Sequence, residues 1–323
     1  MAMRALVYGS FGGIEALHIG EASVPEIADD EVLIRVCAGS INPFDWKLRR
    51  GLLRDFFAVK FPITAGRDGC GSIVSLGTSV VQEGGASLRP GQRVSFVSSR
   101  LQHGALAEFV AVKARGSVVP AAENMSDEQC AALPLVGVSA WNAIVETADV
   151  QAGMKVLIHG GSGGVGGLAI QLARHLGAEV YATCSAAKTG AVEDLGATAI
   201  PYDKVDFTDA VSGCDVVLDT IGGEVHEKSY TVLKKGGRLV YLIARPFNDR
   251  SGDFDVQTRQ VIVSGRTESL HQVMALAGKG RLVPTISKTL PLAEFRDAFR
   301  SAESGSAGGK VVLEISGGAS VNS

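Results

Sequence analysis

The stretch KVLIHGGSGGVGGLAIQLARHLGAEVYATCS, residues 155–185, decides the fold of this chain of 323 residues. It begins with an apolar run at 156–158 that has the length of a buried strand. A glycine-rich turn at 160–167 follows, and then apolar residues at the spacing of a helix with one buried face. A second apolar run at 180–182 ends the stretch. Strand, turn, helix and strand together predict a βαβ unit.

The glycine-rich turn matches the dinucleotide fingerprint G-x-G-x-x-G at Gly161, Gly163 and Gly166. Glycine permits positive φ and lets the backbone approach a pyrophosphate closely. A helix starting near Val165 would also direct free N–H groups at the phosphates. Because the motif follows a strand and opens a helix, we predict a dinucleotide site at these residues and Gly164. A purely structural turn is the alternative.

The end of the second predicted strand favours NADPH over NADH. An NAD site is expected to carry Asp or Glu near the end of this strand, about 20 residues beyond the glycines, whereas residues 182–188 read ATCSAAK and no acid follows them before Glu193. Thr183, Ser185 and Lys188 instead suit a 2′-phosphate, because lysine and hydroxyl groups can donate hydrogen bonds to it. For Lys188 the alternative is a solvated lysine at a helix start. We therefore expect NADPH as the cofactor.

Length and composition are those of an ordinary globular chain. At roughly 100–200 residues per domain, 323 residues predict two domains. The net charge of -3 gives no sign of a nucleic-acid partner. The N-terminus lacks a secretory segment, and no stretch approaches the ~18 consecutive apolar residues of a membrane span. We expect a cytoplasmic protein that binds no membrane. Its cysteines are expected to be reduced, buried thiols; they are Cys37, Cys70, Cys130, Cys184 and Cys214.

The order of the predicted elements indicates an α/β protein with an additional β-rich domain. Short strands separated by turn signals fill residues 1–122 and predict antiparallel pairing; we place them at 3–8, 18–20, 31–38, 71–76 and 104–112, with a turn and a further strand within 89–97, and residues 117–120 close the region. Asn42 and Pro43 predict the start of a short helix. From the capping residue Ser126 onward, strands alternate with helices, which predicts a doubly wound parallel sheet whose last strand is at 260–263. Two amphipathic helices and a strand at 310–315 then return to the first domain.

Several motifs together resemble the medium-chain dehydrogenase/reductase superfamily along nearly the whole chain. They are FPITAGRDGCGSIVSLG (61–77), LPLVGVSAWNAI (133–144), GSGGVGGLAIQLARHLGA (161–178), DVVLDTIGG (215–223) and GGKVVL (308–313). The segment INPFDWK (41–47) is similar to the zinc-free quinone oxidoreductase and enone-reductase branch. The resemblance implies a GroES-like catalytic domain at 1–122 and 266–323, a Rossmann cofactor domain at 123–265, and NADPH in the cleft between them. It also implies a homodimer, joined through the edge strand near Gln260.

The resemblance implies a set of residues near the cofactor. Lys47, Ser185, Lys188, Tyr202, Gly309 and Lys310 belong to this set. We group with them the residues that end or follow the predicted Rossmann strands: Thr183, Ile221, Leu242 and Ile243.

Zinc-dependent members of the superfamily carry a Cys, a Gly-His-Glu and a second Cys as catalytic motifs. At those positions this chain has Asn42, Arg67 with Asp68, and Leu135. Leucine cannot ligate a metal and arginine is a cation, so we expect no zinc. The reaction left to NADPH is hydride donation to a polarised acceptor, a quinone or an α,β-unsaturated carbonyl compound.

Asn42 and Lys47 are the candidate catalytic residues. Lys47 would bind the nicotinamide ribose or donate to the developing oxyanion. Phe44 and Trp46 either form a wall of the substrate pocket or pack in the core. An NADP-dependent alcohol dehydrogenase and a non-catalytic NADPH-binding protein are the alternative functions.

Overall fold

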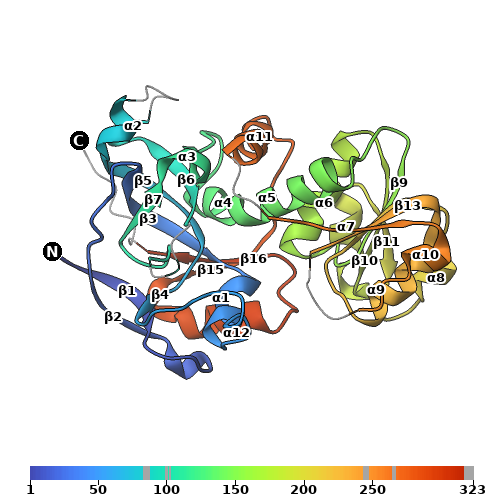
Figure 1. Ribbon diagram of the computed structural model, residues 1–323, viewed down its shortest axis with the longest axis horizontal. Helices are drawn as coiled ribbons and strands as arrows, with labels where there is room; N and C mark the ends of the chain where they lie inside the picture. Colours follow the sequence, from blue (N-terminus) through green and yellow to red (C-terminus); the bar gives the residue numbers. More distant parts are fainter. Residues whose placement is uncertain (83–87, 99–100, 102, 243–246, 264–266, 316–323) are drawn as a thin grey trace. The chain divides into compact units, whose positions relative to one another are not determined.

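A computed structural model describes residues 1–82, 88–98, 101, 103–242, 247–263 and 267–315 (Figure 1). The chain divides into two compact units. The first consists of Met1–Leu135, Gly265–Lys279 and Ile286–Ser323, and the second of Val136–Ser264 and Gly280–Thr285. The expected domain boundaries after residues 122 and 265 stay a prediction.

The first unit is rich in β-strands. They are β1 (Ala2–Tyr8), β2 (His18–Ser23), β3 (Glu31–Ile41), β4 (Ile63–Thr64), β5 (Asp68–Leu76), β6 (Arg93–Val97), β7 (Phe109–Lys113), β8 (Val118–Pro120), β15 (Ile286–Pro291) and β16 (Lys310–Glu314). Within the described residues they form one sheet of order β15-β16-β3-β5-β6-β8, with β7 also on β3, and a second of order β2-β1-β4. All of these pairs are antiparallel except β15 with β16.

The alternation predicted for β3 positions the core of this unit. Val32, Ile34 and Val36 have no exposed surface and belong to one apolar cluster with residues of β5, β6 and β16. β16 pairs antiparallel with β3, so the predicted return of the C-terminal strand is confirmed. In Figure 1 this strand, drawn in red, runs among elements drawn in blue.

One predicted strand of the first unit is shorter than expected. We placed it at 104–112, but β7 covers only Phe109–Lys113. Residues 104–107 bond elsewhere: Leu6 N donates to Leu106 O, and Leu106 N donates to Ala65 O. Alternation alone does not distinguish these two uses of an apolar run.

Short helices complete the first unit. They are α1 (Pro43–Arg49), α2 (Thr78–Gln82), α3 (Ala114–Ser117), α4 (Asp127–Ala132), α11 (Thr267–Gly278) and α12 (Phe295–Glu303), with single turns η1 (Ile14–Ala16) and η6 (Leu292–Glu294). Asn42 caps α1 as predicted, in a capping box with Asp45. Ser126 caps α4 in the same way, with Gln129 as its partner.

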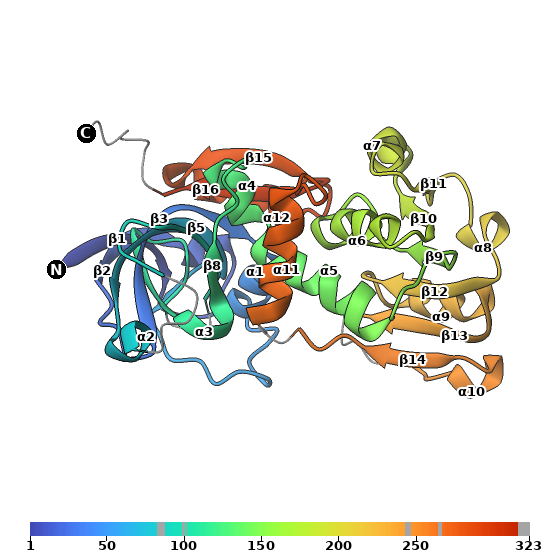
Figure 2. The same ribbon diagram turned by 90° about the horizontal axis from the view of Figure 1, so that it is seen from above.

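The second unit contains the parallel sheet that the opening stretch predicted. Its strands are β9 (Lys155–Ile158), β10 (Glu179–Cys184), β11 (Thr198–Pro201), β12 (Cys214–Asp219), β13 (Leu233–Tyr241) and β14 (Gln257–Gln260). All pairs are parallel, in the order β11-β10-β9-β12-β13-β14, which Figure 2 shows side by side. This is the Rossmann strand order: β10 and β11 lie on one side of β9, and the later strands lie on its other side.

The remaining helices accompany this sheet along the chain. They are α5 (Pro134–Trp141), η3 (Asn142–Thr147), α6 (Gly164–His175), η4 (Ala186–Lys188), α7 (Thr189–Asp194), α8 (Phe207–Ala210), α9 (Glu224–Ser229), η5 (Tyr230–Val232) and α10 (Ser251–Phe254). Helix α6 contacts β9 and β10, the strands on either side of it in sequence. The βαβ unit is therefore formed as predicted.

The last Rossmann strand lies three residues earlier than predicted. The sequence predicts it at 260–263, but β14 covers Gln257–Gln260, and among the described strands it pairs only with β13. An edge strand tolerates such polar residues, because only one of its sides is covered. The apolar residues follow the strand instead, and Ile262 is 77% exposed.

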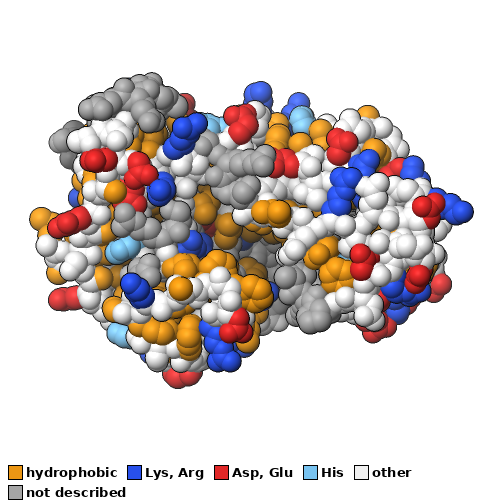
Figure 3. Space-filling view, viewed as in Figure 1, with side chains coloured by type: hydrophobic (Ala, Val, Ile, Leu, Met, Phe, Trp, Pro, Cys, Tyr) orange, Lys and Arg blue, Asp and Glu red, His pale blue; other side chains and the backbone are white. Residues whose placement is uncertain are grey.

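The visible surface carries charges of both signs, interspersed over it (Figure 3). Exposed large apolar side chains follow α1 in the sequence, with Leu52 60% and Phe56 72% exposed. Within the described residues, none of the helices combines the length and apolar character needed to cross a membrane.

Candidate functional site

The turn between β9 and α6 has the geometry that the glycine fingerprint predicted. Gly160 has a φ of 74°, and Gly163, in extended conformation, is the N-cap of α6 without a side-chain cap. A Cβ at Gly161 would come within 2.7 Å of the Ala182 side chain, and one at Gly166 would collide with the carbonyl oxygen of Gly160. These two glycines therefore let the helix pack tightly on its own turn and on β10.

The start of α6 offers donors for an anion. Gly164, Val165 and Gly166 form the first turn of this helix of 12 residues, where N–H groups have no intrahelical acceptor. The helix dipole adds partial positive charge at the same point. Because the turn is narrow enough that a Cβ would fill it, it fits the close backbone approach of a pyrophosphate.

Thr183 supports this turn from β10. Its side chain is buried, and its hydroxyl accepts a hydrogen bond from the Gly160 N–H at 3.2 Å. His159 Nδ1 lies 3.2 Å from the same hydroxyl, and Nε2 lies 3.0 Å from the Ser229 hydroxyl. Burial lowers the pKa of His159 to about 4, so the ring is neutral. With its proton on Nε2, the ring donates a hydrogen bond to the Ser229 hydroxyl and accepts one at Nδ1 from the Thr183 hydroxyl.

The ends of β10 and β11 bring together the residues expected at a 2′-phosphate. Ser185 precedes the short turn η4, Lys188 is the last residue of that turn, and Tyr202, which is 64% exposed, follows β11. Tyr202 N donates to Cys184 O at 2.9 Å, which joins the two strand ends.

Asp203, which is not among the predicted site residues, also lies at this edge. Its Oδ1 accepts a hydrogen bond from the Ala186 N–H at 2.7 Å. The carboxyl ends of neighbouring parallel strands meet at one edge of a sheet, so an acid in the turn after β11 reaches the same place as one after β10.

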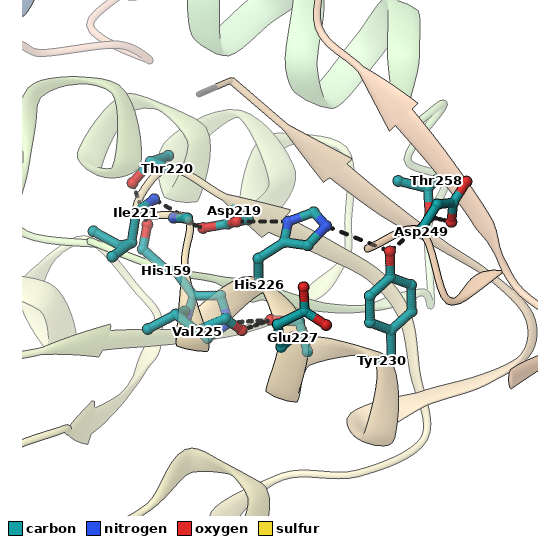
Figure 4. Close-up of polar contacts among 12 residues, drawn as sticks. His159, Asp219, Thr220, Ile221, Val225, His226, Glu227, Tyr230, Asp249 and Thr258 are labelled. Carbon is teal, nitrogen blue, oxygen red and sulfur yellow. Dashed lines mark hydrogen bonds and ion pairs between the residues drawn. The ribbon is translucent and has the colours of Figure 1, made fainter. Parts of the chain in front are cut away.

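Asp219, at the end of β12, organises the next turn (Figure 4). Its Oδ1 accepts hydrogen bonds from the N–H groups of Ile221 (2.8 Å) and Gly222 (2.9 Å), and its Oδ2 lies 2.9 Å from His226 Nδ1. Burial opposes ionisation, but these hydrogen bonds hold the pKa of Asp219 below its ordinary value. The carboxylate thus fixes the turn that exposes Ile221, whose side chain is 44% exposed.

The same contacts continue outward from His226, as Figure 4 shows. Its Nε2 lies 3.4 Å from the Tyr230 hydroxyl, which lies 3.3 Å from the Thr258 hydroxyl on β14. The half-buried Leu242 follows β13 and donates its N–H to Asp219 O at 3.1 Å. Ile243, the other residue expected there, lies outside the described residues.

A second polar cluster is buried in the first unit around Asp68. Its Oδ1 accepts hydrogen bonds from the Ser40 hydroxyl (2.5 Å) and from Asn42 Nδ2 (2.7 Å), and its Oδ2 accepts one from the Leu135 N–H (2.9 Å). The Lys310 ammonium donates to Asn42 Oδ1 at 2.5 Å and to Ile41 O at 3.2 Å. The structure therefore places Asn42 and Lys310 in contact.

Burial controls the charges of this cluster. It raises the pKa of Asp45 to about 7, although the Asn42 N–H donates to that carboxylate at 2.7 Å. It also lowers the pKa of Lys310, against the attraction of Asp68 and Asp45. Lys310 is only 4% exposed. A role at the cofactor for Lys310 and for Gly309 stays a prediction.

Lys47 lies on α1, one helix turn beyond the Asn42 cap. Its side chain is half-buried, with the ammonium 5.5 Å from the ring centroid of Trp46. The guanidinium of Arg67 lies 5.3 Å from the ring centroid of Phe44. Trp46 also packs against the core of the first unit, which supports the core-packing alternative for this residue.

The residues at the positions of the zinc ligands do not fit the metal. Both oxygens of Asp68 already accept hydrogen bonds, Asn42 is engaged by Asp68 and Lys310, and Leu135 offers only its backbone. A catalytic zinc needs about three Cys, His or carboxylate ligands. Throughout the described ranges, His, Cys, Asp and Glu nowhere gather in a group of three or more that would hold a metal ion.

Comparison with known proteins agrees with this architecture. Residues 28–123 match the family model of the alcohol dehydrogenase GroES-like domain, and residues 195–313 match that of the zinc-binding dehydrogenase. The first unit thus carries a GroES-like domain, and the second carries the Rossmann-like sheet.

Individual relatives match almost the whole chain. The 2-methylene-furan-3-one reductase of Solanum lycopersicum is 33% identical, over 96% of this chain and 79% of the relative. The chloroplastic NADPH-dependent alkenal/one oxidoreductase of Arabidopsis thaliana matches with the same identity and coverage, 33%, 96% and 79%. The solved structure of the quinone oxidoreductase from Coxiella burnetii has a TM-score of 0.86 and 29% identity, and covers 98% of this chain and 100% of that one. The chain therefore belongs to the medium-chain dehydrogenase/reductase superfamily, in its quinone oxidoreductase branch.

Proposed function

We propose that this oxidoreductase transfers a hydride from NADPH to a quinone or an α,β-unsaturated carbonyl compound without zinc. The observation that carries the proposal is the cluster at Asp68. The groups at the zinc-ligand positions bind each other, so a reaction that needs a metal-bound alkoxide is disfavoured. The names of the similar reductases agree with this reaction class.

Residues of the second unit would hold the dinucleotide. The N–H groups of Gly164, Val165 and Gly166 would bind the pyrophosphate. Ser185, Lys188 and Tyr202 would donate to the 2′-phosphate, since they meet at the edge formed by β10 and β11. These assignments predict that NADPH binds more tightly than NADH.

Bound NADPH would supply the hydride. Hydride addition to an enone or quinone leaves negative charge on an oxygen, and aligned hydrogen-bond donors stabilise that charge. Of the two candidate catalytic residues, Lys47 suits this role better, because Asn42 uses Nδ2 for Asp68 and Oδ1 for Lys310. Asn42 would then act by capping and orienting α1, the helix that carries Lys47.

The test measures NADPH oxidation with a naphthoquinone, an α,β-unsaturated ketone and an enoyl thioester. We expect turnover of at least one acceptor, and a loss of about 100-fold in kcat/KM in Lys47→Ala, the size found when one oxyanion donor is removed. Lys60→Ala is the control, because Lys60 is an exposed lysine that follows α1 in the sequence. Full activity of Lys47→Ala would overturn the role of Lys47.

The same measurements separate the alternative functions. NADPH binding without turnover of any acceptor would favour the non-catalytic protein. Oxidation of a secondary alcohol with NADP⁺, together with stoichiometric zinc in metal analysis, would favour the alcohol dehydrogenase.

The homodimer and the cytoplasmic location stay part of the proposal. β14 is an edge strand, and the residue Ile262 just after it is 77% exposed, which supports pairing with a second copy there. Free cysteines suit a reducing compartment.

A further inference from the structure

The turn after β12, residues 220–223, lies against the glycine turn of the proposed pyrophosphate site. The Thr220 hydroxyl donates a hydrogen bond to His159 O at 2.7 Å. A Cβ at Gly160 would come within 2.7 Å of that hydroxyl and within 3.2 Å of Ile221 Cδ1. β12 pairs with β9 on the side opposite to β10. This segment, the Ile221 turn, therefore meets the glycine turn from the side away from β10.

This position relates the Ile221 turn to one half of the cofactor, in a step that rests on the proposed function. The 2′-phosphate is assigned to the edge formed by β10 and β11, and the pyrophosphate to the start of α6. A dinucleotide crosses the carboxyl ends of the strands at the point where the strand order reverses. Its nicotinamide half would therefore extend toward the end of β12, where the exposed side chain of Ile221 lies.

A buried carboxylate holds the Ile221 turn from the interior of the second unit (Figure 4). Asp219 is 1% exposed, and its Oδ1 accepts hydrogen bonds from the N–H groups of Ile221 and Gly222. Because these two bonds use one oxygen, the orientation of the carboxylate also depends on the partner of Oδ2. That partner is His226, whose Nδ1 lies 2.9 Å away. A carboxylate only accepts, so Nδ1 carries the proton.

The ring of His226 is itself fixed by its surroundings. It lies on α9 and is 2% exposed. Its centroid lies 5.4 Å from that of the Tyr241 ring and 4.3 Å from that of the Phe247 ring. The Tyr230 hydroxyl lies 3.4 Å from its Nε2. A ring that is packed and bonded at both nitrogens presents its Nδ1–H to Asp219 in one direction.

The next turn of α9 supports the glycine turn instead. The Ser229 hydroxyl, three residues after His226, accepts a hydrogen bond from His159 Nε2 at 3.0 Å. His159 Nδ1 lies 3.2 Å from the Thr183 hydroxyl, which supports the glycine turn. The two side chains of α9 thus serve different turns. A ligand that lacks the nicotinamide half would need the glycine turn but not the Ile221 turn.

We propose that His226 is a positioning residue, which fixes the Ile221 turn through Asp219 for the nicotinamide half of the cofactor. A buried acceptor without a donor is costly. Without the Nδ1 donor, the carboxylate would turn away from the two backbone N–H groups, and the Ile221 turn would lose its fixed conformation. The effect should therefore be confined to ligands that carry the nicotinamide ribose.

Calorimetry tests this with two ligands, NADP⁺ and adenosine 2′,5′-bisphosphate, which carries the 2′-phosphate and one phosphate of the pyrophosphate but no nicotinamide half. In His226→Ala we expect NADP⁺ to bind about 10-fold more weakly, the effect of one lost hydrogen bond to a charged group. Adenosine 2′,5′-bisphosphate should bind as it does to the wild type. His226→Asn keeps an N–H donor and should restore NADP⁺ binding. His175→Ala, at an exposed histidine that ends α6, is the control and should change neither affinity.

The outcomes separate this proposal from the proposed function. Equal losses of affinity for both ligands in His226→Ala, or no loss for either, would overturn the role of His226 and leave the proposed function in place. A wild-type chain that binds neither ligand would overturn the proposed function, and the role of His226 with it.

Hydrogen exchange measured by NMR gives a second test that needs no cofactor. The amides of Ile221 and Gly222 should exchange faster in His226→Ala than in the wild type, and in His226→Asn they should exchange as slowly as in the wild type. Equal exchange in all three chains would overturn the proposal. Where His226→Ala fails to fold, Asp219→Asn takes its place in both measurements, because it keeps the volume of the side chain. It should show the same selective loss of NADP⁺ binding.

Discussion

Asp203 places a carboxylate at the edge of the sheet where Ser185, Lys188 and Tyr202 also lie. A 2′-phosphate bound there would meet lysine and hydroxyl donors, but it would also meet this negative charge. In the proposed site, single residues at this edge would therefore decide between NADPH and NADH, and Lys188 would supply the cation that opposes Asp203.

Lys188→Ala should lower the preference for NADPH. Loss of a hydrogen bond to a charged group costs about 1.5–3 kcal/mol, so we expect KM for NADPH to rise about 10- to 100-fold while KM for NADH stays unchanged. Steady-state kinetics with both cofactors measure this ratio. Lys204→Ala, an exposed lysine nearby in the sequence, should leave it unchanged. Equal effects on both cofactors would assign Lys188 to the fold instead of the 2′-phosphate.

Asp45 should make the stability of the protein depend on pH. Burial raises its pKa from 3.8 to about 7, so the folded state holds the proton more tightly than the unfolded chain does. The contribution of Asp45 to the free energy of unfolding is fully present below about pH 4. About 4 kcal/mol of it is lost as the pH rises to 7. Asp45→Asn should remove this loss, which denaturant unfolding between pH 4 and pH 8 measures.

Asp55→Asn provides the control for this measurement, because the Asp55 side chain is 88% exposed. It should show the same pH dependence as the wild type. An Asp45→Asn variant that loses as much stability between pH 4 and pH 7 as the wild type would show that other groups cause the loss.

At the scale of the element, the βαβ unit depends on the contact between α6 and its own turn. Gly166 makes this contact possible, since a Cβ there would collide with the Gly160 carbonyl oxygen. Gly190, in α7, has no neighbour within 4 Å of the corresponding position and belongs to an ordinary helix turn. The two glycines thus have different physical reasons to be there.

Gly166→Ala should destabilise the protein by about 1–3 kcal/mol, because the extra methyl group overpacks the turn, and it should abolish dinucleotide binding. Gly190→Ala should instead stabilise it by up to about 1 kcal/mol, since alanine favours the helix. Thermal unfolding with and without NADPH gives both results. Normal cofactor binding by Gly166→Ala would remove the turn from the proposed site.

Local signals were sufficient to predict these elements, because each depends on neighbours in sequence. The glycine turn, the Asn42 cap and the parallel sheet follow from spacing and capping chemistry. The position of β14 does not follow from such a pattern, since an edge strand needs no apolar alternation. The contact of Asp203 with Ala186 and the contact of Lys310 with Asn42 were not predicted, because pairing of distant segments leaves no local pattern.

At the scale of the whole molecule, assembly should depend on the apolar residues after β14. Ile262 is 77% exposed just after β14, whose outer edge pairs with no strand of the described residues, and this is an unfavourable surface for a monomer. Ile262→Glu should therefore convert the expected dimer into a monomer, as measured by sedimentation or light scattering. Val283→Glu, at a residue 45% exposed, should leave the assembly unchanged. A wild-type chain that is monomeric at all concentrations would refute the predicted dimer.

The contact between Lys310 and Asn42 has a consequence for the order in which the nascent chain folds. The two residues are 268 positions apart, which at roughly 5–20 residues per second corresponds to about 15 to 50 seconds of synthesis. During that time β3 lacks its neighbour β16, and Asn42 lacks the ammonium group of Lys310. Nearly all of the second unit leaves the ribosome within the same interval. The second unit can thus fold while the first unit still lacks β16.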